Sequence, residues 1–530
     1  MKMLEPGQVK SLLAGTGEVA LLDTREHGLY GEGHPFLAVN CPLSMLELRI
    51  LHLVPCKSTQ VVLLDDGDGV AERAAGRMEA LGYRNVAIMN GGAAAWSREG
   101  YTLFRGVNVP SKAFGELVEH HYGTPSIGPD QLRDLMAARS DLVVLDGRTP
   151  AEYEKMNIPG AHSCPNAETG FRIADLVPSP QTTIVVNCAG RTRSIIGTQT
   201  LRELGVENPV FALENGCQGW MLAGLELDRG SSAAPPDTIS PKAERIARER
   251  ASRFIREYAI RHVSYRQLQA WLREEDRTTY LFDVRSKPEF ERGHIRDAQS
   301  APGGQLVQAT DHWIAVRRAR VVVTDDGSAR GAPTVRWLCA MGHDAYLLDQ
   351  DVRDCPDLLD GPATPTDVPS VLPAIDLRSA IARLERGATL LDFSSSQAFR
   401  NGHLVGARWA IRPRVFALGL KPDDEIIVTA ADPRIARLAA RDLCDAGFSN
   451  IAGLDAVPSQ WAAAGLVEST PDQPTPEEMI DFLFFVHGRH DGDLESARLY
   501  LEWELGLVSQ LDDDERGIFS LPSPMSGAAE

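Results

Sequence analysis

Cys188 is the residue whose surroundings in this 530-residue sequence most favour chemistry. It lies in the segment NCAGRTRS, between an apolar run at 183–186 and a helix-like stretch at 194–204. The first turn of a helix presents backbone N–H groups and the positive end of the helix dipole, which stabilise a thiolate and a bound anion. Arg191 and Arg193 add positive charge to the same turn. The sequence therefore predicts a reactive thiol beside an anion-binding loop.

The elements that position this loop belong to a pattern that occurs four times. Each copy begins with a short apolar run that ends in aspartate, followed by an amphipathic segment and a small-residue turn. A second apolar run, a tight loop and a helix-like segment follow further along each copy, and Cys188 stands in the second copy. Such an internal repeat, with strands alternating with helices, predicts parallel sheets covered by helices on both faces. The strand-end aspartates are Asp23, Asp146, Asp283 and Asp392.

The copies are separated by more than 100 residues, so each is expected to be a whole domain. Pro- and Ser-rich segments mark linkers, and the aromatic spacing near the carboxyl terminus predicts helices that pack on the repeats or on another subunit. The predicted divisions are repeat one at 1–107, repeat two at 124–232, a linker and charged helix at 233–262, repeat three at 263–362, repeat four at 370–468, and a helical tail at 475–530.

Three segments of repeat two resemble the rhodanese family of sulfurtransferases. They are Asp146-Gly147-Arg148, the turn at 158–161, and the loop from Cys188 to Ser194. The resemblance extends over the four repeats and implies an α/β fold. It also implies that the cysteine accepts sulfane sulfur from a donor such as thiosulfate, becomes a persulfide, and passes the sulfur to cyanide or a thiol. No metal or organic cofactor is implied.

This chemistry requires a nucleophilic thiolate, N–H donors for the persulfide, and positive charge for the leaving anion. Cys188 is the predicted nucleophile. The predicted anion cradle is the loop formed by Ala189, Gly190, Arg191, Thr192, Arg193 and Ser194. Arg193 or Arg191 would bind the donor, and Thr192 and Ser194 could add hydroxyl donors. Ser194 is also expected to cap the following helix.

Two further residues of repeat two are ambiguous. Arg148 is a candidate anion-binding residue, but Asp-x-Arg pairs also occur in the first and third repeats, which favours a structural ion pair that braces the loops. Cys217 follows the next strand, so a resolving or relay role is conceivable. A packed small residue is the favoured interpretation, because Ala93 stands at the matching position of repeat one and free cysteines are commonly buried.

The other repeats have no thiol where Cys188 stands. Asp65, Asp325 and Ala430 take its place, so these repeats cannot form a persulfide there. We expect the two carboxylates to repel an anion. The resemblance implies inactive domains, and scaffolding, regulation and partner binding are all open for them. A histidine just before the small-residue turn recurs in these three repeats, whereas the second repeat has Asn157, which argues against a catalytic role for that position. The three histidines are His34, His294 and His403.

Two other functions compete with sulfur transfer. Phosphatases of the related fold surround phosphate with a cysteine, five residues and an arginine, but here Arg193 is the fifth residue after Cys188, and Asn187 stands where such enzymes usually carry histidine. The smaller loop suits a sulfur atom better. The second competitor is a non-catalytic scaffold, or a persulfide carrier that a partner protein loads.

Composition limits the partners. A net charge of −19 argues against nucleic acid or an anionic membrane surface as the main partner. The amino terminus lacks the apolar core of a secretory signal, and no stretch reaches the roughly 18 apolar residues of a membrane span. The eight cysteines include no CxxC pair, so neither a disulfide framework nor a metal site is expected. We therefore expect a cytoplasmic protein that acts on small sulfur compounds, with a protein sulfur donor or acceptor left open.

Overall fold

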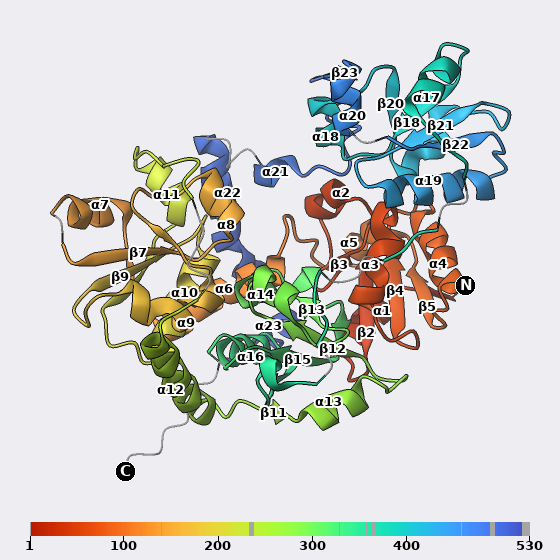
Figure 1. Cartoon of the computed structure of the whole chain (residues 1–530). Helices are drawn as coiled ribbons and strands as arrows, with labels where there is room; N and C mark the ends of the chain where they lie inside the picture. The colour runs from red at the N-terminus through yellow and green to blue at the C-terminus, as the bar shows by residue number, and fades with distance from the viewer. Residues whose placement is uncertain are drawn as a thin grey trace.

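The computed structural model contains four α/β units in chain order, as the four repeats predict (Figure 1). It describes residues 2–138, 140–232, 238–327, 329–356, 358–362, 366–369, 372–456, 458–487 and 493–521.

Repeat two, which carries Cys188, is a five-stranded parallel sheet in the order β6-β10-β9-β7-β8. Strands β7 and β9 are apolar and buried along most of their length, as expected for a sheet with helices on both faces. Strand β9 therefore ends in the middle of the sheet, directly before Cys188. The elements are β6 (Ser126–Ile127), α7 (Pro129–Ala137), β7 (Leu142–Asp146), α8 (Pro150–Lys155), β8 (His162–Ser163), α9 (Asn166–Leu176), β9 (Thr183–Asn187), α10 (Thr192–Glu203), β10 (Val210–Leu213) and α11 (Gly216–Leu222).

Repeat one follows the same strand order, β1-β5-β4-β2, with β3 also paired to β2. Its elements are β1 (Lys2–Leu4), α1 (Pro6–Ala14), β2 (Val19–Asp23), α2 (His27–Glu32), β3 (Val39–Asn40), the 3-10 helix η1 (Leu43–Met45), α3 (Leu46–Leu53), β4 (Gln60–Leu64), α4 (Val70–Ala80), β5 (Val86–Met89) and α5 (Gly92–Arg98).

Repeat three has the order β11-β16-β15-β12-β13. Its elements are β11 (His262–Val263), α13 (Tyr265–Trp271), β12 (Thr279–Asp283), α14 (Lys287–Arg292), β13 (Gln299–Ser300), α15 (Gly303–Gln308), η2 (Thr310–His312), β14 (Val316–Arg317), β15 (Arg320–Thr324), α16 (Gly331–Ala340), β16 (Asp344–Leu348) and η3 (Val352–Asp354).

Repeat four has the order β17-β22-β21-β18-β20, and β19 and β23 form a separate antiparallel pair. Its elements are β17 (Ala374–Ile375), α17 (Leu377–Leu384), β18 (Thr389–Asp392), α18 (Ser396–Asn401), β19 (His403–Leu404), β20 (Ala407–Trp409), η4 (Arg412–Leu418), β21 (Ile426–Thr429), α19 (Pro433–Asp445), β22 (Ile451–Leu454), α20 (Pro458–Ala463) and β23 (Val467–Glu468).

Repeats one and three share a hydrophobic core, which the sequence pattern did not predict. Strand β14 of repeat three pairs antiparallel with β2, with Val316 opposite Ala20, and extends the sheet of repeat one. One continuous apolar cluster includes Ile50 from repeat one and Phe282 from repeat three. The two repeats therefore fold as one block.

Helices outside the repeats connect these units. Helix α6 (Val109–Tyr122) joins repeats one and two, and α12 (Pro241–Glu257) joins repeats two and three. The described part of the tail contains α21 (Phe484–His487), α22 (Leu494–Gln510) and α23 (Asp513–Arg516). Helix α22 packs on α6 and α11, which confirms that the tail packs on the repeats (Figure 1). Among the described residues, no helix is both long and apolar enough to cross a membrane.

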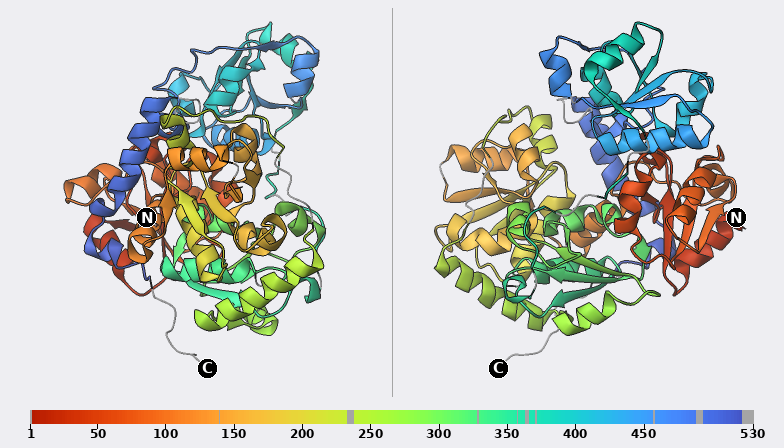
Figure 2. Two further views of the ribbon diagram at one scale, coloured as in Figure 1. Left: turned by 90° about the vertical axis from the view of Figure 1, so that its left-hand side faces the viewer. Right: turned by 45° about the vertical axis from the view of Figure 1, so that its right-hand side comes forward.

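Buried arginines connect neighbouring repeats. Arg330 of repeat three is fully buried and bonds Glu168 of repeat two as well as Glu289 of its own repeat. Arg412 of repeat four is buried between Glu47 of repeat one and Asp442 of its own repeat. Repeat four accordingly lies against repeat one, as the right-hand view of Figure 2 shows. Removing one partner from such a cluster leaves an uncompensated buried charge, so these contacts fix the relative positions of the repeats.

The histidine before the small-residue turn has a structural role in repeat one. His34 Nδ1 donates to the carbonyl of Tyr30 (2.9 Å), and the two rings stack with centroids 3.7 Å apart. In repeat two, Asn157 Nδ2 donates to the matching carbonyl of Tyr153 (3.1 Å). The side chain at this position thus binds the preceding helix in both repeats.

His34→Asn should make the stability of the protein less sensitive to acid. Burial lowers the pKa of His34 to about 3, so below about pH 6.5 the unfolded chain takes up a proton that the folded chain does not. Between pH 6.5 and 5 the wild type should lose about 1.5 kcal/mol more stability than His34→Asn, measured by urea unfolding. His262→Asn, at an exposed position, is the control. Parallel pH profiles for wild type and His34→Asn would contradict this account.

Candidate active site

The Cys188 loop is a sharp turn between β9 and α10. Cys188 follows the last residue of β9 and is 2% exposed. Its Sγ lies 3.7 Å from the hydroxyl oxygen of Ser194, which comes from the first turn of α10. The thiol therefore lies at the carboxyl end of a central strand and against the amino end of a helix, as the sequence predicts.

The start of α10 differs from the prediction. The helix begins at Thr192, and Arg191 is its N-cap residue. Ile195 N–H bonds the carbonyl of Arg191 (3.2 Å), so the prediction that Ser194 caps the helix is wrong. Ser194 lies within the first turn, where its hydroxyl donates to the carbonyl of Arg191 (2.8 Å).

The loop of repeat one shows what its backbone can bind. Asp65, which replaces the cysteine, accepts hydrogen bonds from the N–H groups of Gly67 (2.8 Å) and Ala71 (3.0 Å). The carboxylate itself therefore occupies these backbone donors, which agrees with the expectation that it would exclude another anion.

The loop of repeat three has the same property. Asp325 accepts from the N–H groups of Arg330 (3.1 Å) and Gly331 (2.8 Å). Counted from the cysteine position, the donors of these two loops are the second, fifth and sixth residues. In repeat two those positions are Gly190, Arg193 and Ser194. Their N–H groups are thus the candidate donors for a negative sulfur on Cys188.

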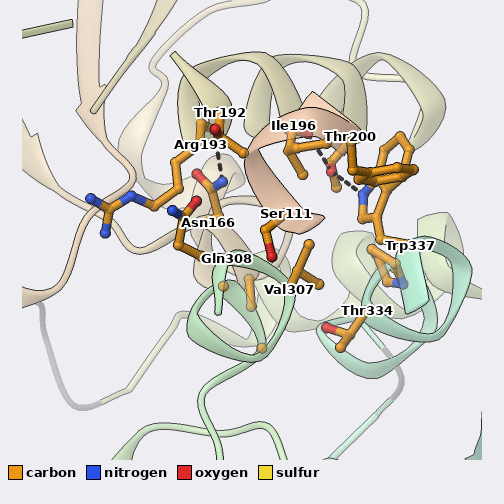
Figure 3. Close-up of a pocket in the computed structure, with 15 residues that line it drawn as sticks. Ser111, Asn166, Thr192, Arg193, Ile196, Thr200, Val307, Gln308, Thr334 and Trp337 are labelled. Atoms are coloured by element: carbon orange, nitrogen blue, oxygen red, sulfur yellow. Dashed lines mark hydrogen bonds between the residues drawn. The ribbon is translucent and has the colours of Figure 1, made fainter. Parts of the chain in front are cut away.

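The two loop arginines are already paired with carboxylates. Arg193 makes a bidentate ion pair with Glu152 of α8 (2.7 and 2.8 Å), and its side chain points away from the other labelled residues in Figure 3. Burial opposes the charge of Glu152, yet Arg193 holds the pKa of that carboxyl well below its ordinary value. Arg191 binds Glu116 (2.7 Å) and Glu119 of α6. The positive charge of the loop is therefore largely balanced in this structure.

Arg148 supports the strand ends that lead into the loop. It is 1% exposed, and its guanidinium donates to Asp146 (2.6 Å) and to the carbonyl of Met156 (2.6 Å). Asn187, the last residue of β9, donates to the same carboxylate (3.0 Å). Because Arg25 and Arg285 bind Asp23 and Asp283 in the same way, this geometry favours the bracing interpretation.

The start of α11 packs against the backbone of the loop. Gly216 has a φ of +53°, and a Cβ there would lie 2.2 Å from the carbonyl oxygen of Cys188. The N–H of Cys217 donates to that carbonyl (2.8 Å). The Cys217 thiol is fully buried, and burial raises its pKa to about 12. A thiol with this pKa remains protonated near neutral pH, which favours a packing role for Cys217.

Helix α22 of the tail also contacts the loop, and sequence reasoning missed it. Glu504 is 0% exposed and accepts a hydrogen bond from the Thr192 hydroxyl (2.7 Å). The carboxylates that bind the loop arginines were missed as well. Only Glu152 carries a local signal, because it completes a capping box with Thr149.

A small cavity lies near the loop, between repeats two and three (Figure 3). Thr192 and Arg193 line one side, and Val307 and Trp337 of repeat three line the other. Its volume of about 30 Å³ accommodates a water molecule rather than a sulfur donor. Within the described part of the chain, no group of three or more His, Cys, Asp or Glu side chains could hold a metal ion.

The fold and the site together define a class of protein: tandem parallel α/β domains, one of which presents a cysteine on a loop between a central strand and a helix. The model of the rhodanese-like domain matches residues 5–99, 128–223 and 264–354. The chain therefore belongs to the rhodanese family. Repeat four has the same strand order but lies outside the matched segments.

Solved structures include a match over the whole chain. The crystal structure of a thiosulfate sulfurtransferase from Pseudomonas aeruginosa is 38% identical, with a TM-score of 0.91, and the match covers 99% of this chain and 100% of that one. The Alr3790 protein from Anabaena sp. is 25% identical over 19% of this chain and 82% of its own, with a TM-score of 0.18. No curated protein matches the sequence. The family and the whole-chain match support a function of the sulfurtransferase type.

Gly216→Ala should disrupt the loop. The new Cβ would collide with the carbonyl of Cys188, and the alanine would have to adopt an unfavourable positive φ. We therefore expect a loss of about 3 kcal/mol in the free energy of unfolding. Gly224→Ala is the matched control, because Gly224 has a φ of +76° but no neighbour within 4 Å of an added Cβ. The control should lose only about 1 kcal/mol in urea unfolding. Equal losses would show that the Gly216 contact does not constrain the loop.

Proposed function

We propose that this protein is a sulfurtransferase that moves sulfane sulfur from a donor such as thiosulfate to cyanide or a thiol through a persulfide on Cys188. One observation carries the proposal. Cys188 stands at the loop position where, in repeats one and three, backbone N–H groups hold a carboxylate. A thiolate or persulfide at this position would receive the same donors.

The proposed reaction has two displacement steps. After the Cys188 thiol has lost its proton to solvent, the thiolate attacks the outer sulfur of thiosulfate, and a new S–S bond forms. The S–S bond of thiosulfate breaks, and sulfite leaves with the electron pair. Cyanide or a thiolate then attacks the terminal sulfur of the persulfide, and the Cys188 thiolate leaves. Thiocyanate or a new persulfide is released, and the enzyme is regenerated.

Backbone donors are the main anion-binding groups in this proposal. Because Arg191 and Arg193 are balanced by carboxylates, we assign persulfide stabilisation to the N–H groups of Gly190, Arg193 and Ser194. These groups are fixed before the donor arrives, so no reorganisation is needed when negative charge reaches the terminal sulfur. The Arg193 side chain keeps a supporting role as a nearby positive charge. Arg148 is assigned to bracing.

A reducing, cytoplasmic setting is also part of the proposal. All eight cysteines are free in the structure, and free thiols persist in reducing compartments.

Cys188→Ser should abolish sulfur transfer. The hydroxyl is similar in size to the thiol but is a far poorer nucleophile, so thiocyanate formation from thiosulfate and cyanide should fall about a thousandfold or more. Cys444→Ser, at an exposed cysteine, is the control and should retain wild-type activity. If Cys188→Ser keeps the wild-type rate, the proposed function is wrong.

A further inference from the structure

We propose that helix α22 of the tail is part of the active site, and that Glu504 is a positioning residue for the Cys188 loop. This inference rests on the proposed function. It concerns a segment that lies outside all four repeats and more than 300 residues from Cys188 in the sequence.

Glu504 joins three elements at the loop. Its Oε1 accepts hydrogen bonds from the Thr192 hydroxyl (2.7 Å) and from Lys112 Nζ (3.2 Å). Thr192 is the first residue of α10, and Lys112 belongs to α6. All three residues are buried. A buried carboxylate is stable only when it is paired and hydrogen-bonded, so this arrangement fixes the start of α10 against two helices from outside the repeat.

The tail helix also covers the turn of the loop. A Cβ on Gly190 would lie 3.1 Å from Glu504 Oε2, 3.7 Å from the ring of Tyr500 and 3.9 Å from Leu501. Gly190 is the loop residue whose N–H corresponds to a carboxylate donor in repeat one. The absence of a side chain on Gly190 therefore allows α22 to approach the backbone that is proposed to bind the persulfide.

This cover differs from the surroundings of the loop in repeat one. At Gly67, the position that matches Gly190, an added Cβ would meet nothing within 4 Å. At Gly327 of repeat three, the nearest atoms belong to Arg248 of α12. Among these three loops, the tail covers the one that carries the cysteine.

A positioning role and an electrostatic role for Glu504 predict opposite effects when its carboxylate is removed. A carboxylate near an anion-binding loop disfavours negative charge on the sulfur, so removing only its charge should favour loading of the thiol. Positioning predicts the opposite result. Because small displacements of catalytic groups slow a reaction strongly, losing the bond between Glu504 and Thr192 should slow loading.

The test uses the full-length chain and measures two rates at Cys188. The first is sulfur loading from thiosulfate in a single turnover, followed by mass spectrometry. The second is alkylation by iodoacetamide as a function of pH, followed on the peptide that contains Cys188, because the exposed Cys444 would react as well. Glu504→Leu removes the acceptor, and Glu504→Gln keeps one oxygen acceptor for Thr192. Glu502→Gln, at an exposed position of the same helix, is the matched control.

Glu504→Leu should load sulfur roughly tenfold more slowly than the wild type and show an altered pH profile of alkylation. Glu504→Gln should recover part of the loading rate. Thr192→Val should reproduce the defect of Glu504→Leu, and the double variant should be no slower than Glu504→Leu, because the two residues act through one bond. If Glu504→Leu does not fold, Thr192→Val carries the same test.

Two results would overturn the inference. One is loading at or above the wild-type rate in both Glu504 variants, which would leave Glu504 with an electrostatic or purely structural role. The other is a Glu504→Leu variant that unfolds at a lower temperature but keeps the wild-type pH profile of Cys188 alkylation, which would show a purely structural role. If the wild type takes up no sulfur while Glu504→Leu still changes the alkylation profile, the proposed function fails but the positioning role of Glu504 stands.

Discussion

The convergence of backbone N–H groups at the end of a buried central strand is the constraint on which this site depends. Those groups must find an acceptor, because unpaired buried donors are costly. In repeats one and three the acceptor is a side-chain carboxylate of the loop itself, from Asp65 or Asp325. In repeat two the same position carries Cys188, and the proposed acceptor for these donors is the negative sulfur of its thiolate or persulfide. The residue at this position thus decides whether the loop supplies its own acceptor, and the proposed function depends on that difference.

The rest of the molecule holds that turn in place. Arg148 binds Asp146 at the end of the neighbouring strand, and Gly216 allows α11 to pack against the carbonyl of Cys188. Arg191 and Glu504 connect it to α6 and α22, which belong to no repeat. Repeat three adds Arg330, whose side chain binds Glu168 at the start of α9. Repeat three, which lacks the loop cysteine, therefore contributes to the frame around repeat two.

Local patterns in the sequence predicted the features that depend on neighbours in the chain. The apolar runs and their spacing predicted four parallel α/β units, and the loop composition singled out Cys188. The recurrence of Asp-x-Arg predicted a structural ion pair, which all three pairs form. The N-cap was predicted wrongly, because the helix starts two residues earlier than the preference of serine for the N-cap position suggests, with Ile195 N–H bonded to the carbonyl of Arg191.

Contacts between distant segments could not be predicted in this way. Glu504 lies at helical spacing from the apolar residues Tyr500 and Leu507, but the local pattern does not show that this face of α22 packs on α6 beside the Cys188 loop. The pairing of Arg191 with Glu116 and the pairing of β14 with the sheet of repeat one have the same origin. These contacts arise from tertiary packing, which carries no local periodicity.

The most direct test of the central claim is the intact mass of the protein after incubation with thiosulfate. The account predicts a gain of about one sulfur atom per chain, reversed by cyanide, and located on the peptide that contains Cys188. A protein that gains no sulfur under these conditions, or that gains it on another cysteine, would contradict the assignment of Cys188 as the residue that carries sulfur.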